Sequence, residues 1–157
     1  MPFLTVDSPA PDFTLKDQDG NDTSLAALKG KWTVLYFYPK DDTPGCTREA
    51  CNFRDNFGAL KELGAHVLGV SGDSETSHKK FAAKYELPFT LLVDTGNSLA
   101  KSFGAWGTKS MYGKTYDGII RSTVVINPEG KIARVWPKVK PDAHGLEVLE
   151  WLRANAA

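Results

Sequence analysis

Residues 33–51 decide the fold, and they read Thr33-Val34-Leu35-Tyr36-Phe37-Tyr38-Pro39-Lys40-Asp41-Asp42-Thr43-Pro44-Gly45-Cys46-Thr47-Arg48-Glu49-Ala50-Cys51. The run before Pro39 is apolar and rich in β-branched and aromatic residues, which is typical of a strand buried on both faces. Thr43 followed by Pro44 predicts a helix N-terminus, because threonine favours the N-cap and proline the first helical position. We therefore expect a buried strand followed by a helix over residues 44–63.

The flanking sequence alternates strand patterns with helix patterns. Further strands are predicted at residues 66–71, 90–93, 122–126 and 131–136, and further helices at residues 74–86, at residues 97–103 and after a capping Asp142. A short hairpin and one helical turn precede them, and residues 104–118 are interpreted as a loop rich in glycine, lysine and aromatic residues. This order predicts an α/β fold with a central mixed β-sheet flanked by helices and an N-terminal β-hairpin extension. Without a repeat or a linker, residues 1–157 are expected to form a single domain.

Composition narrows the class of protein. The chain has 157 residues with 19 basic and 19 acidic side chains, so its net charge is zero, which argues against a nucleic-acid partner. No apolar run is long enough to span a membrane, and the first residues lack the pattern of a signal peptide. We expect a cytoplasmic protein, where two cysteines are more often reactive or metal-binding than structural.

Cys46 falls at an unusual place in the predicted helix. With Thr43 as N-cap, Cys46 occupies the third helical position, which a glutamate or glutamine holds in a capping box. A thiolate there would accept hydrogen bonds from unpaired amides and interact with the positive end of the helix dipole. Both effects favour the nucleophilic, ionised sulfur. The alternative is a small buried hydrophobic residue on a core helix.

Cys51 lies five residues after Cys46. On an intact helix their Cα atoms are about 8–9 Å apart, whereas a disulfide needs them within about 7 Å. If the two act as a dithiol, the first turn of the helix must unwind. Cys51 is equally compatible with a buried structural role. A zinc site is disfavoured, because the spacing of the cysteines and of three scattered histidines does not suit four ligands.

The segment from Phe37 to Cys51 resembles the active-site motif of the peroxiredoxins, and more closely that of their Q subfamily, the bacterioferritin comigratory proteins. The similarity extends over nearly the whole chain, through Ala10-Pro11-Asp12-Phe13, Gly69-Val70-Ser71 and Gly113-Lys114-Thr115-Tyr116 before Arg121. It implies a thioredoxin-like fold and a thiol peroxidase that acts on hydrogen peroxide and small organic hydroperoxides without a metal or another cofactor.

The resemblance also implies a role for each matching residue. Cys46 would be the peroxidatic cysteine, oxidised to a sulfenic acid, and Cys51 the resolving cysteine that condenses with it to an intramolecular disulfide. Thr43 would hold the peroxide, Pro39 would shield the pocket from water, and Arg121 would support the thiolate. Thioredoxin or a similar dithiol would reduce the disulfide, and an internal disulfide favours a monomer. Val124 and Asn127 depart from the residues usual in the family, at positions near the arginine strand.

Several residues keep more than one interpretation. Glu49 either orients Arg121 or is a surface helix residue, and we favour the surface. Asp41 and Asp42 would oppose a thiolate by their charge and are expected to be solvated. His66, His78 and His144 are expected to be satisfied or exposed rather than to act as bases. The part of the predicted loop from Trp106 to Gly118 precedes Arg121, and it either lines the entrance for peroxide or has no part in the site.

Two other functions remain open from the sequence. One is a protein dithiol oxidoreductase, although the Cys-x-x-Cys spacing of those enzymes is absent. The other is a redox-sensing or chaperone-like module, in which oxidation of Cys46 changes the shape of the protein without turnover.

Overall fold

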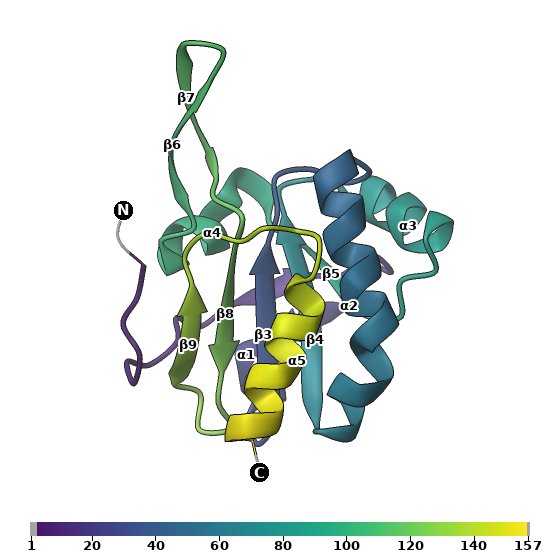
Figure 1. Cartoon of the computed structure of the whole chain (residues 1–157), viewed down its shortest axis with the longest axis vertical. Helices are drawn as coiled ribbons and strands as arrows, with labels where there is room; N and C mark the ends of the chain where they lie inside the picture. Colours follow the sequence, from purple (N-terminus) through teal and green to yellow (C-terminus); the bar gives the residue numbers. More distant parts are fainter. Residues whose placement is uncertain (1–2, 157) are drawn as a thin grey trace.

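The computed structural model describes residues 3–156, and a five-stranded sheet lies at the centre (Figure 1). Its strands follow the order β5-β4-β3-β8-β9. The central strand β3 pairs in parallel with β4 and antiparallel with β8, so the sheet is mixed, as predicted. The bounds are β3 (Trp32–Phe37), β4 (Ala65–Ser71), β5 (Thr90–Val93), β8 (Ser122–Ile126) and β9 (Ile132–Trp136).

Helices cover both faces of this sheet. They are α1 (Leu25–Leu28), α2 (Pro44–Glu62), α3 (Glu75–Lys84), α4 (Ser98–Phe103) and α5 (His144–Asn155), with a 3-10 turn η1 (Thr95–Asn97) before α4. Successive side chains of β3 point to opposite faces, so Val34 and Tyr36 pack in the cluster of α2 and α5, which lie in front of the sheet in Figure 1. Leu35 and Phe37 pack in the cluster that contains α1 and α4. Burial on both faces explains why the strand is a continuous apolar run.

The junction from β3 to α2 forms as the sequence predicts. Thr43 is the N-cap with an extended backbone, and Pro44 stands at the first helical position. The Thr43 hydroxyl, however, donates to the carbonyl of Lys40 at 2.9 Å, so the side chain does not cap a helical amide. This junction sets the first turn of α2 at the carboxyl end of β3, the edge where α/β sheets place ligands.

Two elements differ from the sequence predictions. Residues 104–118 are not a loop: they contain the hairpin of β6 (Trp106–Met111) and β7 (Lys114–Ile119), which projects from the rest of the molecule in Figure 1. Its turn places Tyr112 and Gly113 at positive φ (54° and 77°), and a tyrosine there is an uncommon turn signal.

The start of α5 is the second difference. Ala143, not Asp142, is the N-cap of α5, and the Asp142 carboxylate pairs instead with Arg48 of α2 at 2.7 Å. The backbone amide of Leu146 donates a hydrogen bond to the side-chain oxygen of Asn52 in α2 at 3.0 Å. A contact between two helices therefore caps α5 in place of a local residue.

The N-terminal hairpin is confirmed as β1 (Thr14–Lys16) paired antiparallel with β2 (Asp22–Ser24). Among the described residues, no helix is both long and apolar enough to span a bilayer.

Candidate active site

Cys46 lies in the first turn of α2 and is 1% exposed. The Arg121 guanidinium approaches it from the segment before β8, with Nη2 at 3.1 Å from Sγ. This contact joins residues 75 positions apart in the sequence. A hydrogen bond from a guanidinium to an ionised sulfur is charge-assisted, so Arg121 is placed to stabilise negative charge at this atom. Arg121 rather than a helix amide is thus the donor to the sulfur among the described residues.

Gly45 leaves the space that this approach requires. A Cβ added at Gly45 would lie 3.1 Å from Arg121 Nη2, tighter than ordinary side-chain contacts. Any larger residue would push the guanidinium away from Cys46 or shift the helix start. The glycine of the Thr43-Pro44-Gly45-Cys46 sequence therefore has a steric role at the site.

Glu49 is fully buried, so the interpretation as a surface residue is wrong. Its Oε1 accepts a hydrogen bond from Arg121 Nη1 at 2.7 Å, while its Oε2 is buried and has no hydrogen-bond partner in the part of the chain that the structure describes. Burial raises the pKa of Glu49 to about 7, against the opposing effect of the Arg121 charge. One arginine thus bridges the sulfur and a carboxyl group, and the carboxyl fixes the direction of the guanidinium.

Replacement of Glu49 by glutamine is expected to change how stability depends on pH. The unfolded carboxyl ionises near 4.5 and the folded one at about 7, so stability is lost as pH rises between these values. The shift corresponds to roughly 3 kcal/mol. Glutamine keeps an oxygen for Arg121 but has no proton to lose, so we expect Glu49→Gln to lack this loss. Urea unfolding of the reduced wild type and of reduced Glu49→Gln at several pH values measures the free energy of unfolding of each. The other titrating groups contribute equally to both proteins, so the difference reports Glu49. Parallel curves of free energy against pH would contradict the raised pKa of Glu49.

Thr43 and Pro39 are near this centre in sequence, but the structure gives them different surroundings. The Thr43 side chain is half-buried at the N-cap, and its hydroxyl hydrogen is directed at Lys40. Pro39 is exposed and lines a cavity of about 370 Å³ together with Lys40, Trp106, Lys109 and Tyr116. The base of the β6–β7 hairpin thus lies beside Pro39 in the β3–α2 loop, although Cys46 is not among the lining residues. The roles of Thr43 and Pro39 remain predictions.

Lys109 of β6 is a charged neighbour that the sequence analysis missed. Its Nζ donates to the carbonyl of Ile119 at 2.9 Å. Burial lowers the pKa of Lys109, the Arg121 charge lowers it further, and the charge on Cys46 opposes both. Lys109 thus places a second cation on the hairpin beside the β3–α2 loop, and only recognition of the hairpin would have identified it.

Cys51 is half-buried on the same uninterrupted helix as Cys46, and both are free. The geometric condition from the sequence analysis therefore applies: a bond between them requires the start of α2 to unwind.

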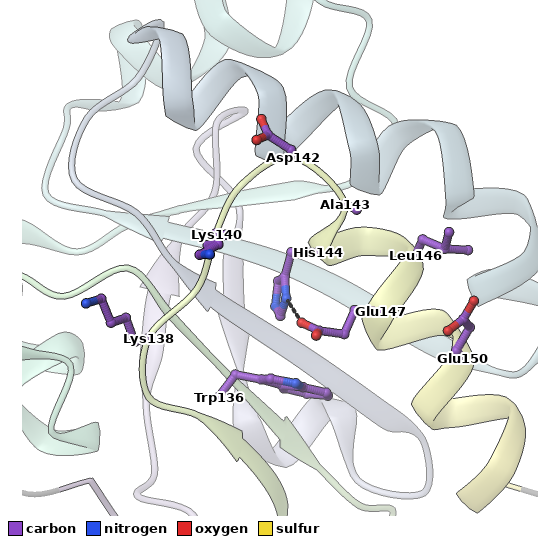
Figure 2. Close-up of a pocket in the computed structure, with 9 residues that line it drawn as sticks. All are labelled: Trp136, Lys138, Lys140, Asp142, Ala143, His144, Leu146, Glu147 and Glu150. Carbon is purple, nitrogen blue, oxygen red and sulfur yellow. Dashed lines mark hydrogen bonds and ion pairs between the residues drawn. The ribbon is translucent and has the colours of Figure 1, made fainter.

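The histidines are satisfied or partly exposed, as expected. His144 lines a cavity of about 600 Å³ beside α5, where Nδ1 lies 2.8 Å from Glu147 (Figure 2). Its Nε2 lies 2.7 Å from the Thr123 hydroxyl, and burial lowers the pKa of His144 despite Glu147. Cys46 and Arg121 do not line this cavity, so it is separate from the site.

Comparison with known proteins gives consistent matches over most of the chain. A model of the AhpC/TSA family matches residues 6–135. A putative peroxiredoxin bcp of Coxiella burnetii is 51% identical over 146 residues, which cover 93% of this chain and 97% of that protein. Peroxiredoxin Bcp of Bacillus subtilis is 48% identical over 150 residues, 96% of each chain. The solved structure of the Xanthomonas campestris bacterioferritin comigratory protein, studied for alkyl peroxide reduction, matches with a TM-score of 0.88 at 42% identity over 92% of each chain.

Proposed function

The chain belongs to the AhpC/TSA family, among the peroxiredoxins of the Q or Bcp type, and on this premise we propose that Cys46 is the sulfur that attacks the peroxide. Its fold is the thioredoxin-like fold that the sequence predicts. The protein is a thiol peroxidase that uses a peroxide substrate and a thiol reductant. The observation that supports Cys46 as its nucleophile is the 3.1 Å contact between its sulfur and Arg121.

In the first step, the Cys46 thiolate attacks the terminal oxygen of the hydroperoxide, which keeps its hydrogen. A sulfur–oxygen bond forms as the oxygen–oxygen bond breaks, and the leaving oxygen takes a proton from solvent to become water or an alcohol. The sulfur becomes a sulfenic acid. Negative charge develops on the leaving oxygen, and Arg121, already beside the sulfur, is the cation placed to stabilise it. In this proposal, Thr43 holds the peroxide and Pro39 shields the pocket from water.

In the second step, the Cys51 thiol condenses with the sulfenic acid. A sulfur–sulfur bond forms and water leaves. Because both residues lie on α2, this step follows unwinding of its first turns, which breaks the contacts of Arg121 with Cys46 and Glu49. The resulting disulfide belongs to one chain, so the catalytic unit is proposed to be a monomer formed by the single domain of residues 1–157.

The substrates are proposed to be hydrogen peroxide and small organic hydroperoxides, in line with the alkyl peroxide reduction studied for the Xanthomonas campestris relative. Thioredoxin or a similar dithiol is the proposed reductant, because exchange of two thiols with the Cys46–Cys51 disulfide restores both cysteines. The cytoplasmic location remains a prediction.

Intact mass after one equivalent of peroxide tests the proposal. The expected product is a species of monomer size that has lost two hydrogen atoms, since disulfide formation removes one from each thiol. Peptide mapping should place the bond between Cys46 and Cys51. A covalent dimer, or a stable monomer that retains one added oxygen, would contradict the intramolecular route, and no change in mass would contradict Cys46 as the nucleophile.

A further inference from the structure

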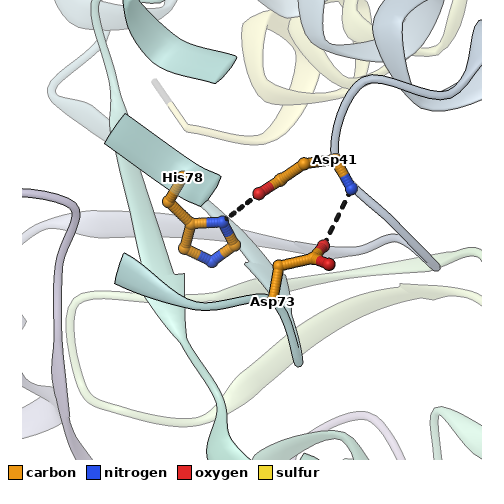
Figure 3. A group of neighbouring side chains, drawn as sticks. All are labelled: Asp41, Asp73 and His78. Carbon is orange, nitrogen blue, oxygen red and sulfur yellow. Dashed lines mark hydrogen bonds and ion pairs between the residues drawn. The ribbon is translucent and has the colours of Figure 1, made fainter. Parts of the chain in front are cut away.

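The loop between β3 and α2 is attached to α3 by a buried carboxylate. Asp41 was expected to be solvated, but it is 7% exposed. Its Oδ1 accepts from the Tyr38 hydroxyl, and its Oδ2 accepts from the Ser77 hydroxyl at 2.8 Å. The same Oδ2 lies 2.6 Å from Nδ1 of His78, which is fully buried in α3 (Figure 3). Asp42, in contrast, is exposed as expected and pairs with Lys84 in solvent.

The acceptors around His78 fix its protonation. Nε2 lies 2.7 Å from the carbonyl oxygen of Leu92, which only accepts, so Nε2 carries a hydrogen. Nδ1 faces the Asp41 carboxylate, and at 2.6 Å a hydrogen must lie between them. His78 and Asp41 together therefore hold one proton more than a neutral imidazole beside a carboxylate. Loss of that proton would set a nitrogen lone pair against a carboxylate oxygen in a buried place.

Polar and charged groups from β3, the segment after β4 and α3 surround the Asp41–His78 pair. Asp73, in the segment after β4, accepts from the Asp41 amide at 2.8 Å and from the Ser71 hydroxyl at 2.7 Å. Tyr38 at the end of β3 and Ser77 of α3 complete the contacts to Asp41. On the solvent side, Lys80 and Lys84 of α3 line a cavity with Asp41. Burial lowers the pKa of His78, but the hydrogen bond and charge of Asp41, with smaller contributions from Leu92 and Asp73, raise it overall.

A metal centre is the other chemistry that these residues suggest. One ligand atom each from Asp41, Asp73 and His78 lie within 4.8 Å of one another. However, hydroxyl and amide hydrogens already occupy the oxygens, and a 2.6 Å contact between Nδ1 and Oδ2 is a hydrogen bond rather than the spacing of two ligands. The cluster is a hydrogen-bonded network.

We propose that the Asp41–His78 pair positions the peroxidatic loop, and that it holds residues 39–43 against α3 only while it retains its shared proton. Asp41 lies two residues from both Pro39 and Thr43, so a change at its side chain displaces both sides of the loop. The proposal rests on the proposed function, because the loop matters to catalysis only if Cys46 is the nucleophile. Neither Asp41 nor His78 touches the reacting atoms, so both are positioning residues.

The sign of the pH effect follows from the shared proton. The pair stabilises the loop fully below the ordinary imidazole pKa of 6.5, and this stabilisation is lost as pH rises through the raised pKa of folded His78. We therefore expect the rate constant for oxidation of Cys46 by peroxide to fall by about tenfold at high pH, an effect that modest misplacement of a catalytic loop produces.

Asp41→Asn tests the proposal because asparagine can satisfy every contact without the additional proton. Its Nδ2 would donate to Nδ1 of a neutral His78 and to the Ser77 oxygen, while its Oδ1 still accepts from Tyr38. The expected result is loss of the high-pH fall in the rate constant, measured by stopped flow from about pH 6 to about pH 9. Ser77→Ala is the matched control: it removes one hydrogen bond from the same carboxylate but keeps the shared proton, and the fall should remain. His78→Gln should lose the fall, as Asp41→Asn does.

Nuclear magnetic resonance separates this proposal from the proposed function. In the wild type at neutral pH, both ring nitrogens of His78 should be protonated, and the amides of residues 40–43 should titrate together with the ring. In Asp41→Asn the ring should be neutral and these amides should not titrate with it. A wild type without the fall, an Asp41→Asn variant that keeps it, or loop amides that do not follow His78 would overturn the proposal. A protein that consumes no peroxide at any pH would overturn the proposed function instead, and the amide titration would still decide whether the pair positions the loop.

Discussion

Cys51→Ser is expected to oxidise once with peroxide and then to stop. The Cys46 sulfur and its contact with Arg121 are untouched by the substitution, so the sulfenic acid should form at nearly the wild-type rate. The hydroxyl of serine does not condense with a sulfenic acid, so no disulfide is available to thioredoxin. In an assay coupled to thioredoxin, thioredoxin reductase and NADPH, we expect a burst of about one turnover for each chain, followed by a steady rate lower by on the order of a hundredfold.

The position of Cys51 explains why this loss should be large. The sulfenic acid forms on a sulfur that is 1% exposed, where an external thiol has little access. In the proposed cycle, Cys51 reaches this sulfur from inside the chain once the start of α2 unwinds, and the same unwinding exposes the product to the reductant. A small thiol such as dithiothreitol should restore slow turnover to Cys51→Ser, which separates loss of resolution from loss of the nucleophile. Sustained turnover with thioredoxin alone would show that Cys51 is not the resolving residue.

The site divides into parts that local sequence determines and parts that it does not. The β3–α2 junction was predictable because Thr43 and Pro44 encode a helix start within a few residues, and this placed Cys46 in the first turn. The burial of Glu49 was not predictable from its helix alone. Its partner Arg121 lies 72 residues away, and a carboxylate becomes tolerable in the core only when such a partner is brought to it by the fold.

Asp41 illustrates the same limit in a loop. Two adjacent aspartates with equivalent local sequence have opposite surroundings: Asp42 remains in solvent, while Asp41 is buried against α3. The difference arises from the left-handed backbone of Asp42 (φ 56°) and from the contact of His78 with Asp41, and a local sequence pattern encodes neither of them. The β6–β7 hairpin was missed for a related reason, because its turn places a tyrosine where asparagine or glycine is the usual signal.

Replacement of Arg121 by glutamine is expected to lower the second-order rate constant for oxidation of Cys46 by about 10²–10³-fold, the usual cost of removing one donor that stabilises developing charge. Arg121 donates 3.1 Å to the sulfur and 2.7 Å to Glu49, so one substitution removes the cation from both. Glutamine keeps hydrogen-bonding capacity but no charge. Stopped-flow measurement of a single oxidation by hydrogen peroxide gives the rate constant without contributions from recycling.

Two controls separate catalysis from folding in this experiment. Removal of Arg121 leaves the fully buried Glu49 without its cation, which destabilises the protein and favours a protonated carboxyl. The double variant Arg121→Gln with Glu49→Gln replaces that buried carboxyl group by a neutral amide, so its stability should recover while its rate constant stays low. Alkylation of Cys46 by iodoacetamide has no leaving oxygen, so its rate reports the reactivity of the sulfur apart from cleavage of the peroxide. If Arg121 acts on the leaving oxygen as well as on the sulfur, the peroxide rate must fall further than the alkylation rate; equal falls would limit its role to the sulfur.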